Sequence, residues 1–280
     1  MTDLLIIGMG SMGSIHAKYA SMLGANWNWY DPAGSQTWVG KRGSKRVESL
    51  DDLSRYSHII VATPADTHAN YLRQLKDFDG HILMEKPGVM ERGDLHLLDD
   101  LRVSVGLVER FNPAFETLLM NVKPDEVLNV DFVRCSARPV SRIKESSYFD
   151  VGIHDIDMLL MLFPDAEIDS RTMDRTGDTF CLMAKLSGGQ VARFIWSNET
   201  FNKERVIQVR QRDCNYVCNL IDQTVKRHSL SADNRNVVED VYVEKASPVR
   251  RELESFFGGT SQVSDRSHSL FLDILGDVGA

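Results

Sequence analysis

A glycine-rich segment near the start of the chain, Gly8-Met9-Gly10-Ser11-Met12-Gly13, has the spacing of a phosphate-binding turn. Gly8 permits a tight turn, Gly10 lets the backbone approach a pyrophosphate, and Gly13 allows a helix to pack closely on a strand. The N–H groups and the positive potential at the start of that helix attract phosphates. The segment therefore predicts a dinucleotide site; the alternative is a glycine turn in an α/β protein that binds no dinucleotide.

An acid follows at the place where a dinucleotide site needs one. Asp31 lies 18 residues beyond Gly13, directly after a predicted strand. A carboxylate there accepts hydrogen bonds from the ribose hydroxyls of the adenosine. Because the same charge repels a 2′-phosphate, Asp31 favours NAD over NADP as the cofactor.

Two short segments, Ala62-Thr63-Pro64 and Glu85-Lys86-Pro87, follow further predicted strands. Ligands of open α/β sheets bind at the carboxyl ends of the strands. The ammonium group of a lysine such as Lys86 can polarise a ligand oxygen and stabilise negative charge that develops on it. A surface lysine before a turn is the plainer interpretation. His68, in the first turn of the next helix, fits a capping or packing role better than a catalytic one.

Asp150 and His154 are four residues apart, so on one helix or its entry turn they would share a face. Oxidation of an alcohol requires removal of the hydroxyl proton, and a histidine near pH 7 suits that work. A neighbouring carboxylate favours the imidazolium that forms. A helix cap and a polar helix face explain the same pair without chemistry. Asp155 and Asp157 fit a structural role as acids at the start of a helix.

These residues need elements that bring them together, and the chain has the pattern of two domains. Over residues 1–121, apolar strand-like runs alternate with helical patterns, which predicts an α/β Rossmann domain with a parallel, doubly wound sheet that binds NAD. Residues 122–280 predict an α+β domain with a mostly antiparallel, open-faced sheet for substrate binding and oligomerisation. We expect strands at 4–7, 27–30, 58–62, 81–84, 103–108, 127–136, 168–176, 179–186, 190–196, 205–211, 216–220 and 237–243, and helices at 14–23, 67–78, 94–101, 154–163, 248–257 and 267–275.

Composition excludes several classes of function. The net charge of −8 argues against a nucleic-acid partner. No apolar run approaches the roughly 20 residues that span a bilayer, and the start of the chain lacks the pattern of a signal peptide. Cys135, Cys181, Cys214 and Cys218 have no paired CxxC spacing, so we expect buried free thiols and no metal site. We therefore expect a cytoplasmic protein without membrane or nucleic-acid partners.

Five motifs, in their order and spacing, resemble the Gfo/Idh/MocA family of sugar and polyol dehydrogenases along nearly the whole chain. They are the glycine turn, Ala62-Thr63-Pro64 with His68, Glu85-Lys86-Pro87, Gly106–Pro113 (GLVERFNP) and Asp150–Asp157 (DVGIHDID). The resemblance implies an NAD-dependent dehydrogenase acting on CH–OH donors. It places Lys86 beside the transferred hydride, makes His154 the proton acceptor, and makes Asp150 its partner or a ligand of a substrate hydroxyl.

The resemblance also implies contacts with both ligands. Besides the glycine turn and Asp31, the implied cofactor contacts are Ala62, Thr63, Pro64, His68, Glu85 and Lys86. Glu109, Arg110 and Asn112 mark the crossing between the domains as candidate substrate contacts, and Asn112-Pro113 has the pattern of a helix start. Glu109 would bind a sugar hydroxyl or, alternatively, face solvent.

The residues of these motifs are most similar to those of family members that oxidise the 3-hydroxyl of UDP-N-acetylhexosamines or their uronates. Arg138 and Arg142 would then receive a diphosphate, or they are surface loop charges. A free polyol such as an inositol is the alternative substrate, and a non-catalytic dinucleotide-binding regulator is the alternative of another class. The joint presence of Lys86, Asp150 and His154 favours the enzyme.

The resemblance further implies a homodimer or homotetramer that assembles through the open face of the second sheet. Four apolar residues alternate along two of its predicted strands: Phe180, Leu182, Phe194 and Trp196. They form such an interface or, equally well, pack under helices of their own domain.

Overall fold

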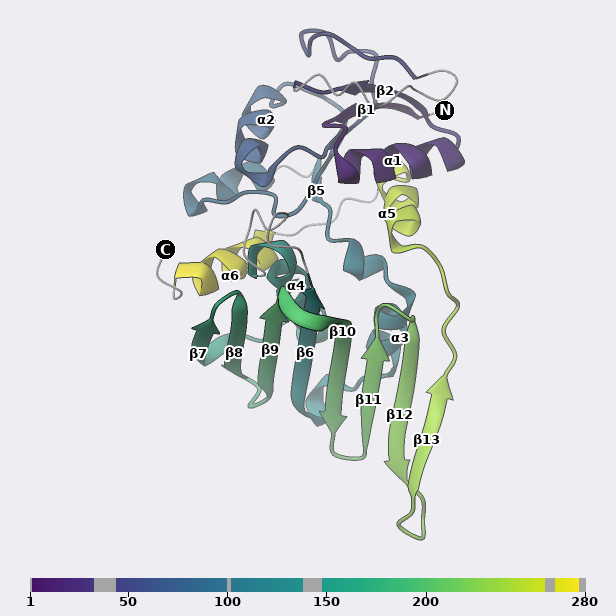
Figure 1. Cartoon of the computed structure of the whole chain (residues 1–280), viewed down its shortest axis with the longest axis vertical. Helices are drawn as coiled ribbons and strands as arrows, with labels where there is room; N and C mark the ends of the chain where they lie inside the picture. The colour runs from purple at the N-terminus through teal and green to yellow at the C-terminus, as the bar shows by residue number, and fades with distance from the viewer. Residues whose placement is uncertain (1, 33–43, 100–101, 138–147, 260–264, 277–280) are drawn as a thin grey trace. The chain divides into compact units, whose positions relative to one another are not determined.

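The computed structural model describes residues 2–32, 44–99, 102–137, 148–259 and 265–276, with only the backbone of residues 149, 150, 265 and 275. The chain forms two compact units: Met1–Val108 with Val249–Leu272, and Glu109–Pro248 with Asp273–Ala280. Figure 1 labels their elements. The first unit is α/β and the second is α+β, as the sequence predicts.

The first unit contains a sheet of five parallel strands in the order β2-β1-β3-β4-β5. The strands are β1 (Asp3–Ile7), β2 (Asn26–Tyr30), β3 (His58–Val61), β4 (His81–Met84) and β5 (Val103–Val105). The helices are α1 (Ser11–Met22), α2 (His68–Gln74), α5 (Pro248–Phe257) and, up to Leu272, α6 (Asp265–Gly276), with the 3₁₀ segments η1 (Ala65–Thr67) and η2 (Arg92–Leu98). Because the strand order reverses beside β1, the glycine turn lies at the switch point where ligands of such sheets bind.

Helix α5 belongs to the first unit although it comes late in the chain. Its Leu253 and Phe256 join Leu4 and Trp27 in one apolar core. The ring of Phe256 also packs edge-on against His58, with 4.9 Å between the ring centroids. The observed units therefore differ from the predicted division into 1–121 and 122–280, because a boundary placed along the chain does not show that a later helix returns to the first sheet.

The second unit contains an eight-stranded sheet in the order β13-β12-β11-β10-β6-β9-β8-β7 (Figure 1). Its neighbouring strands are antiparallel except for the parallel pair β6 and β9. The strands are β6 (Val127–Ala137), β7 (Ile168–Thr176), β8 (Thr179–Leu186), β9 (Val191–Ser197), β10 (Glu199–Gln211), β11 (Cys214–Asn219), β12 (Thr224–Leu230) and β13 (Asn236–Val241). The helical segments are η3 (Val108–Phe111), α3 (Pro113–Asn121), η4 (Pro124–Glu126), the π-helical η6 (Tyr148–Gly152) and α4 (Ile153–Leu162).

Helix α3 packs on the second sheet and not on the first. The hydroxyl of Tyr216 donates to the carbonyl oxygen of Asn121 at 3.3 Å. At the other end of the helix, the side chain of Asn112 donates to the carbonyl oxygen of Leu220 at 3.1 Å. These bonds place α3 with the second unit, although the predicted boundary at residue 121 assigned it to the first domain.

The alternating residues of β8 and β9 face the unit's own core. Phe180, Leu182, Phe194 and Trp196 are at most 2% exposed. Tyr148 of η6 packs against Trp196 with ring centroids 5.4 Å apart. These four side chains therefore pack under a helical segment of their own unit and do not form an outer surface.

Three local expectations differ from the structure. Strand β12 was not predicted because Lys226, Arg227 and His228 interrupt the alternation; pairing with β11 and β13 forms it nonetheless. The segment predicted as a helix over 94–101 is the 3₁₀ segment η2. Cys181 is exposed, unlike the other cysteines, because it occupies an outward position of β8.

Candidate functional site

The glycine turn between β1 and α1 has a backbone shape that requires glycine. Gly8 has a φ of 91°, in the left-handed region, and a Cβ on Gly13 would lie 1.9 Å from the carbonyl oxygen of Gly8. At Gly10, in contrast, a Cβ would meet no described atom within 4 Å. Gly8 and Gly13 are therefore needed by the turn itself, whereas the open space at Gly10 is compatible with its predicted role beside a ligand.

Helix α1 starts at this turn without a capping side chain among the described residues. Gly10 is its N-cap, and Ser11, Met12 and Gly13 form the first turn. The N–H groups of a first helical turn have no carbonyl partner within the helix, and they carry the positive end of the helix dipole. The start of α1 thus presents backbone donors suited to a phosphate.

Asp31, at the end of β2, lies against the same turn. Its Oδ2 accepts a hydrogen bond from the backbone N–H of Met9 at 2.9 Å. The glycine turn and this carboxylate together fit a dinucleotide, with backbone N–H groups for the pyrophosphate and Asp31 for the ribose hydroxyls. A cofactor bound there would be held by residues 8–13 and Asp31.

Lys86 follows β4 at the carboxyl edge of the first sheet, the edge that also carries the glycine turn. Strand β3, followed by Ala62-Thr63-Pro64, lies between the two. Lys86 is half-buried, and its peptide bond to Pro87 is cis. The structure thus brings the three predicted cofactor segments of the first unit to one edge of one sheet.

His68 joins two of these segments. Its ring is buried, with Nδ1 2.8 Å from the carbonyl oxygen of Pro87 and Nε2 3.0 Å from that of Thr63. Both ring nitrogens therefore face backbone oxygens at the ends of β3 and β4. This geometry supports the packing role that the sequence favours for His68, and a contact with the cofactor stays a prediction.

Glu85 forms hydrogen bonds that connect Lys86 to helix α1. Its Oε1 lies 2.6 Å from Nε2 of His16 on α1, and its Oε2 accepts from the backbone N–H of Lys86 at 3.3 Å. Burial opposes ionisation of Glu85, but the hydrogen bond and charge of His16, with the charge of Lys86, hold its pKa below the usual value. The observed partners of Glu85 are thus protein groups, and its predicted contact with the cofactor stays a prediction.

A second buried acid lies near this pair and was not predicted. Glu252 of α5 is 3% exposed, and burial together with the charge of Glu85 raises its pKa well above the usual value. Burial of Glu252 beside Glu85 thus favours the neutral form of Glu252, whereas the partners of Glu85 favour its ionised form. Neither His16 nor Glu252 carries a sequence motif that would have revealed the cluster.

His154 belongs to the predicted motif Asp150–Asp157, which lies in the other unit. It lies in the first turn of α4 and is 7% exposed. The preceding η6 segment, which contains the backbone of Asp150, is π-helical, and such wide turns are frequent at functional sites. Only the backbone of Asp150 is described, so its predicted pairing with His154 stays a prediction. Arg138 and Arg142, the predicted diphosphate ligands, lie outside the described residues.

The acids after His154 are structural, but not simply as helix-start charges. Asp155 accepts from Arg134, at 3.0 and 2.8 Å, and from the indole N–H of Trp196 at 2.8 Å. Asp157 pairs with Arg110 through two bonds of 2.7 and 2.5 Å. These bonds fix α4, and with it His154, to the second sheet and to η3.

Glu109 and Asn112 belong to the same buried network. Oε1 of Glu109 accepts from Arg134 at 2.8 Å and from Arg205 at 3.1 Å, and its Oε2 accepts from Asn112 at 3.0 Å. Asn112 also caps α3 by accepting from the N–H of Ala114, as predicted. Burial opposes ionisation of Glu109, but both guanidinium groups outweigh it and lower its pKa.

The burial of Glu109 decides between the two environments predicted for it. Glu109 is 4% exposed and is therefore not a solvent-facing acid. Glu109, Arg110 and Asn112 each have a protein partner, so they act first as structural residues. Direct contact of these three with a substrate stays a prediction.

We expect Glu109→Gln to lower the free energy of unfolding by about 3 kcal/mol, because it removes the charge that compensates two guanidinium groups, one fully buried. Urea unfolding at pH 7 measures this loss. The folded pKa of Glu109 lies below its unfolded value of about 4.3, so the contribution is present above that pH and is lost as the pH falls. The difference between the two proteins should therefore shrink in acid.

Glu239→Gln is the matched control, because Glu239 pairs with Arg227 at the surface. Its loss should stay below about 1 kcal/mol. Equal small losses in both variants, with weaker substrate binding by Glu109→Gln alone, would instead make Glu109 a substrate ligand.

Two negative findings apply to the described part of the chain. No group of three or more His, Cys, Asp or Glu side chains there could hold a metal ion. No helix among the same residues has the length and apolar character to cross a membrane.

The comparisons with known proteins agree with the motifs. The chain is 27% identical over 177 residues to inositol 2-dehydrogenase of Rhizobium meliloti (strain 1021), covering 56% of this chain and 53% of that protein. It is 25% identical over 182 residues to the rhizopine catabolism protein MocA of Rhizobium meliloti, covering 56% of each. These matches support the resemblance of the chain to the Gfo/Idh/MocA family. It spans about half the length of these curated relatives, and no protein-family model matches it.

Solved structures extend the similarity of fold over nearly the whole chain. UDP-N-acetylglucosamine 3-dehydrogenase GnnA from Acidithiobacillus ferrooxidans matches with a TM-score of 0.84 at 18% identity, covering 98% of this chain and 97% of that one. An NAD-binding protein from Listeria innocua matches with a TM-score of 0.77 at 19% identity, covering 98% and 92%. At these identities the likeness shows a shared fold.

Proposed function

We propose that this chain is an NAD-dependent oxidoreductase that transfers hydride between a secondary alcohol of a sugar ring and the nicotinamide. The observation that carries the proposal is that one edge of the first sheet holds both the glycine turn, with Asp31 against it, and Lys86. A protein that only bound the dinucleotide would have no chemical need for Lys86, Asp150 and His154 together.

The chemistry divides between the cofactor and the chain. The bound nicotinamide supplies the acceptor for hydride. Lys86 donates a hydrogen bond from its ammonium group to the reacting oxygen and stabilises the negative charge that develops there. His154 accepts the hydroxyl proton, and Asp150 favours the resulting imidazolium. Glu85 and His68 act through the backbone on either side of Lys86, as positioning residues.

The substrate class rests on the relatives. The curated matches include an inositol 2-dehydrogenase, and a solved structure of the same fold is named a UDP-N-acetylglucosamine 3-dehydrogenase. We propose a nucleotide sugar oxidised at the 3-hydroxyl, a UDP-N-acetylhexosamine or its uronate. A free polyol such as an inositol is the second candidate.

The direct test adds NAD, or NADP, to the full chain with a panel of UDP-sugars, uronates and inositols, and follows the absorbance of the reduced cofactor. Turnover with at least one ring alcohol supports the proposal. Tight binding of NAD without turnover of any panel member would instead favour a regulator that kept the dinucleotide fold.

We expect Asp31→Ala to lower the preference for NAD over NADP, measured as the ratio of kcat/KM values, by about tenfold or more, because the carboxylate that repels the 2′-phosphate is removed. Asp66→Ala, at an exposed position in the same unit, is the control and should leave the ratio unchanged. A wild-type enzyme that already prefers NADP would contradict this role of Asp31.

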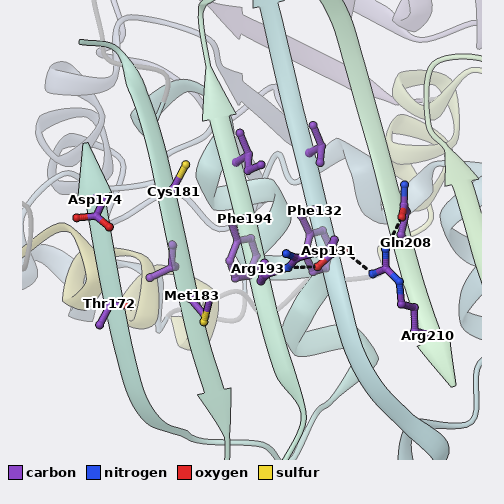
Figure 2. Close-up of a pocket in the computed structure, with 13 residues that line it drawn as sticks. Asp131, Phe132, Thr172, Asp174, Cys181, Met183, Arg193, Phe194, Gln208 and Arg210 are labelled. Carbon is purple, nitrogen blue, oxygen red and sulfur yellow. Dashed lines mark hydrogen bonds and ion pairs between the residues drawn. The ribbon is translucent and has the colours of Figure 1, made fainter. Parts of the chain in front are cut away.

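We also propose that the chain self-associates through the outer face of the second sheet (Figure 2). Asp131 there accepts from Arg193 at 2.6 Å and also pairs with Arg210, while Met183 and Ile195 are 51% and 39% exposed. A second copy of the chain fits this mixture of satisfied charge and exposed apolar surface, as a self-complementary contact requires. Sedimentation tests it, and a monomer at micromolar concentration would contradict it.

A further inference from the structure

The second unit contains a hollow of about 230 Å³, and the charged residues among its described lining are all basic. It lies where β6, β9 and β10 approach one another, and its charged residues are Arg134, Lys203 and Arg205. Arg134 is buried, the side chain of Arg205 is 35% exposed, and Lys203 is exposed. The three cationic side chains of the hollow therefore differ in solvent exposure, from buried Arg134 to exposed Lys203.

Charge compensation in this part of the unit is incomplete. Arg134 bonds to Glu109 and Asp155, and Arg205 shares Glu109. Two carboxylates thus compensate two guanidinium groups beneath the hollow. Lys203 adds a third positive charge, and neither carboxylate pairs with it among the described contacts. The charged side chains among the described lining residues are therefore all positive, which favours an anion.

The polar neighbours of Lys203 shape the same hollow. The hydroxyl of Ser136, on β6, donates to Oδ1 of Asn198 at 3.1 Å. The amide of Asn198 in turn donates to Asp178 at 3.0 Å. These bonds connect the ends of the strands and engage Asp178, which is not a lining residue. Among the described residues that line the hollow, none is a carboxylate.

The hollow adjoins the segment that carries the proposed proton acceptor. Val151, which lines it, follows Asp150 directly and belongs to the same π-helical segment. Arg134, on its floor, bonds to Asp155, the residue after His154. A substrate that presents a hydroxyl to His154 therefore has a basic recess within the same unit for another of its substituents.

The size of the recess limits what enters it. Pockets for whole drug-sized ligands measure about 300–1,000 Å³, so this recess suits one substituent and not an entire nucleotide sugar. A carboxylate or a phosphate group matches its charge, because guanidinium and ammonium groups form short, strong hydrogen bonds with these anions.

We propose that this recess binds an anionic substituent of the substrate, a carboxylate or a phosphate, with Lys203 as its principal charge and Arg205 beside it. The inference rests on the proposed function and narrows it: the substrate is a sugar acid, a sugar phosphate or a nucleotide sugar, and not a neutral polyol. The basic pair at positions 203 and 205 has strand spacing, which puts both side chains on one face.

Steady-state kinetics of the full chain test the inference through Lys203→Met, because Lys203 is exposed and its loss should not affect folding. We expect KM for an anionic sugar to rise about tenfold, with kcat changed less than about twofold, because the variant loses a charge-assisted contact remote from the reacting bond. Lys203→Arg should recover most of the loss. Lys226→Met, at an exposed position on β12, should behave as wild type.

Calorimetric titration without turnover separates the two anions and the two proposals. Glucuronate reports on a carboxylate, whereas UDP and inorganic phosphate report on phosphates. Binding of either class that weakens about tenfold in Lys203→Met, but not in Lys226→Met, supports the recess and shows which anion it takes. If anion binding weakens in Lys203→Met but the wild-type protein turns over no sugar, the proposal of an anion-binding recess stands and the proposed oxidoreductase activity is wrong.

Two outcomes overturn the inference while leaving the proposed function intact. In one, wild-type protein oxidises neutral inositols at least as well as anionic sugars, and Lys203→Met does not change this. In the other, glucuronate, UDP and phosphate bind equally to wild type and Lys203→Met, or do not bind to either.

Discussion

His154→Ala is expected to lower kcat for alcohol oxidation about 10²–10⁴-fold, the usual contribution of a positioned general base. The imidazole lies at the start of α4, and Asp155 and Asp157 fix that helix to Arg134 and Arg110. Because the base is held by a rigid element, its proton transfer requires little reorganisation. Removing the imidazole leaves the reacting hydroxyl without a proton acceptor, while the glycine turn in the other unit is unchanged.

Measurement of kcat with NAD, with a fluorescence titration of NADH for cofactor affinity, tests this result. NADH affinity should change less than about twofold, since the mutation removes no cofactor contact. If His154 is the base, the decline of wild-type kcat/KM toward acid pH should disappear in the variant. His228→Ala, on β12 of the same unit, is the control. Turnover close to wild type would refute the assignment of His154.

The first sheet was predictable because its signals are local. Buried parallel strands appear as continuous apolar runs such as Leu4–Ile7, and the spacing of Gly8 and Gly13 reflects backbone limits that act within a few residues. Pro113 after Asn112 likewise marks the start of α3. Such features depend on chain geometry and not on distant partners.

The buried charge networks were not predictable for the opposite reason. Glu109 meets Arg134 and Arg205 across 25 and 96 residues of sequence. A single sequence shows charged residues at these positions but not their pairing, so Glu109 was equally compatible with solvent exposure. Lys203 and Arg205 lie two residues apart in the sequence, but only the structure shows which other residues line the hollow with them.

The division into units shows the same limit at a larger scale. Helix α5 was predicted as an element, yet its apolar residues Leu253 and Phe256 do not show which sheet they cover. Glu252 beside them became informative only because α5 packs near Glu85. Long-range packing therefore decides the roles of residues whose local structure the sequence already indicates.

Lys86→Ala is expected to lower kcat about 10²–10³-fold, comparable to the loss of one oxyanion-stabilising donor. The ammonium group contributes only as negative charge develops on the reacting oxygen, so KM should change far less than kcat. NADH affinity should be retained, because the glycine turn and Asp31 hold the dinucleotide. Lys76→Ala, at an exposed position in the same unit, should have wild-type activity.

The pH dependence separates the role of Lys86 from that of His154. If Lys86 stabilises charge without accepting the proton, Lys86→Ala should keep the acid decline of kcat/KM at its lower rate, whereas His154→Ala loses that decline. The reverse pattern would make Lys86 the base. Lys86→Arg should retain part of the activity, because it keeps a positive charge where Glu85 and His68 hold the backbone, although a planar guanidinium does not reproduce the geometry of an ammonium group. Wild-type turnover in Lys86→Ala would remove the lysine from the chemistry and leave the first unit as a dinucleotide-binding unit alone.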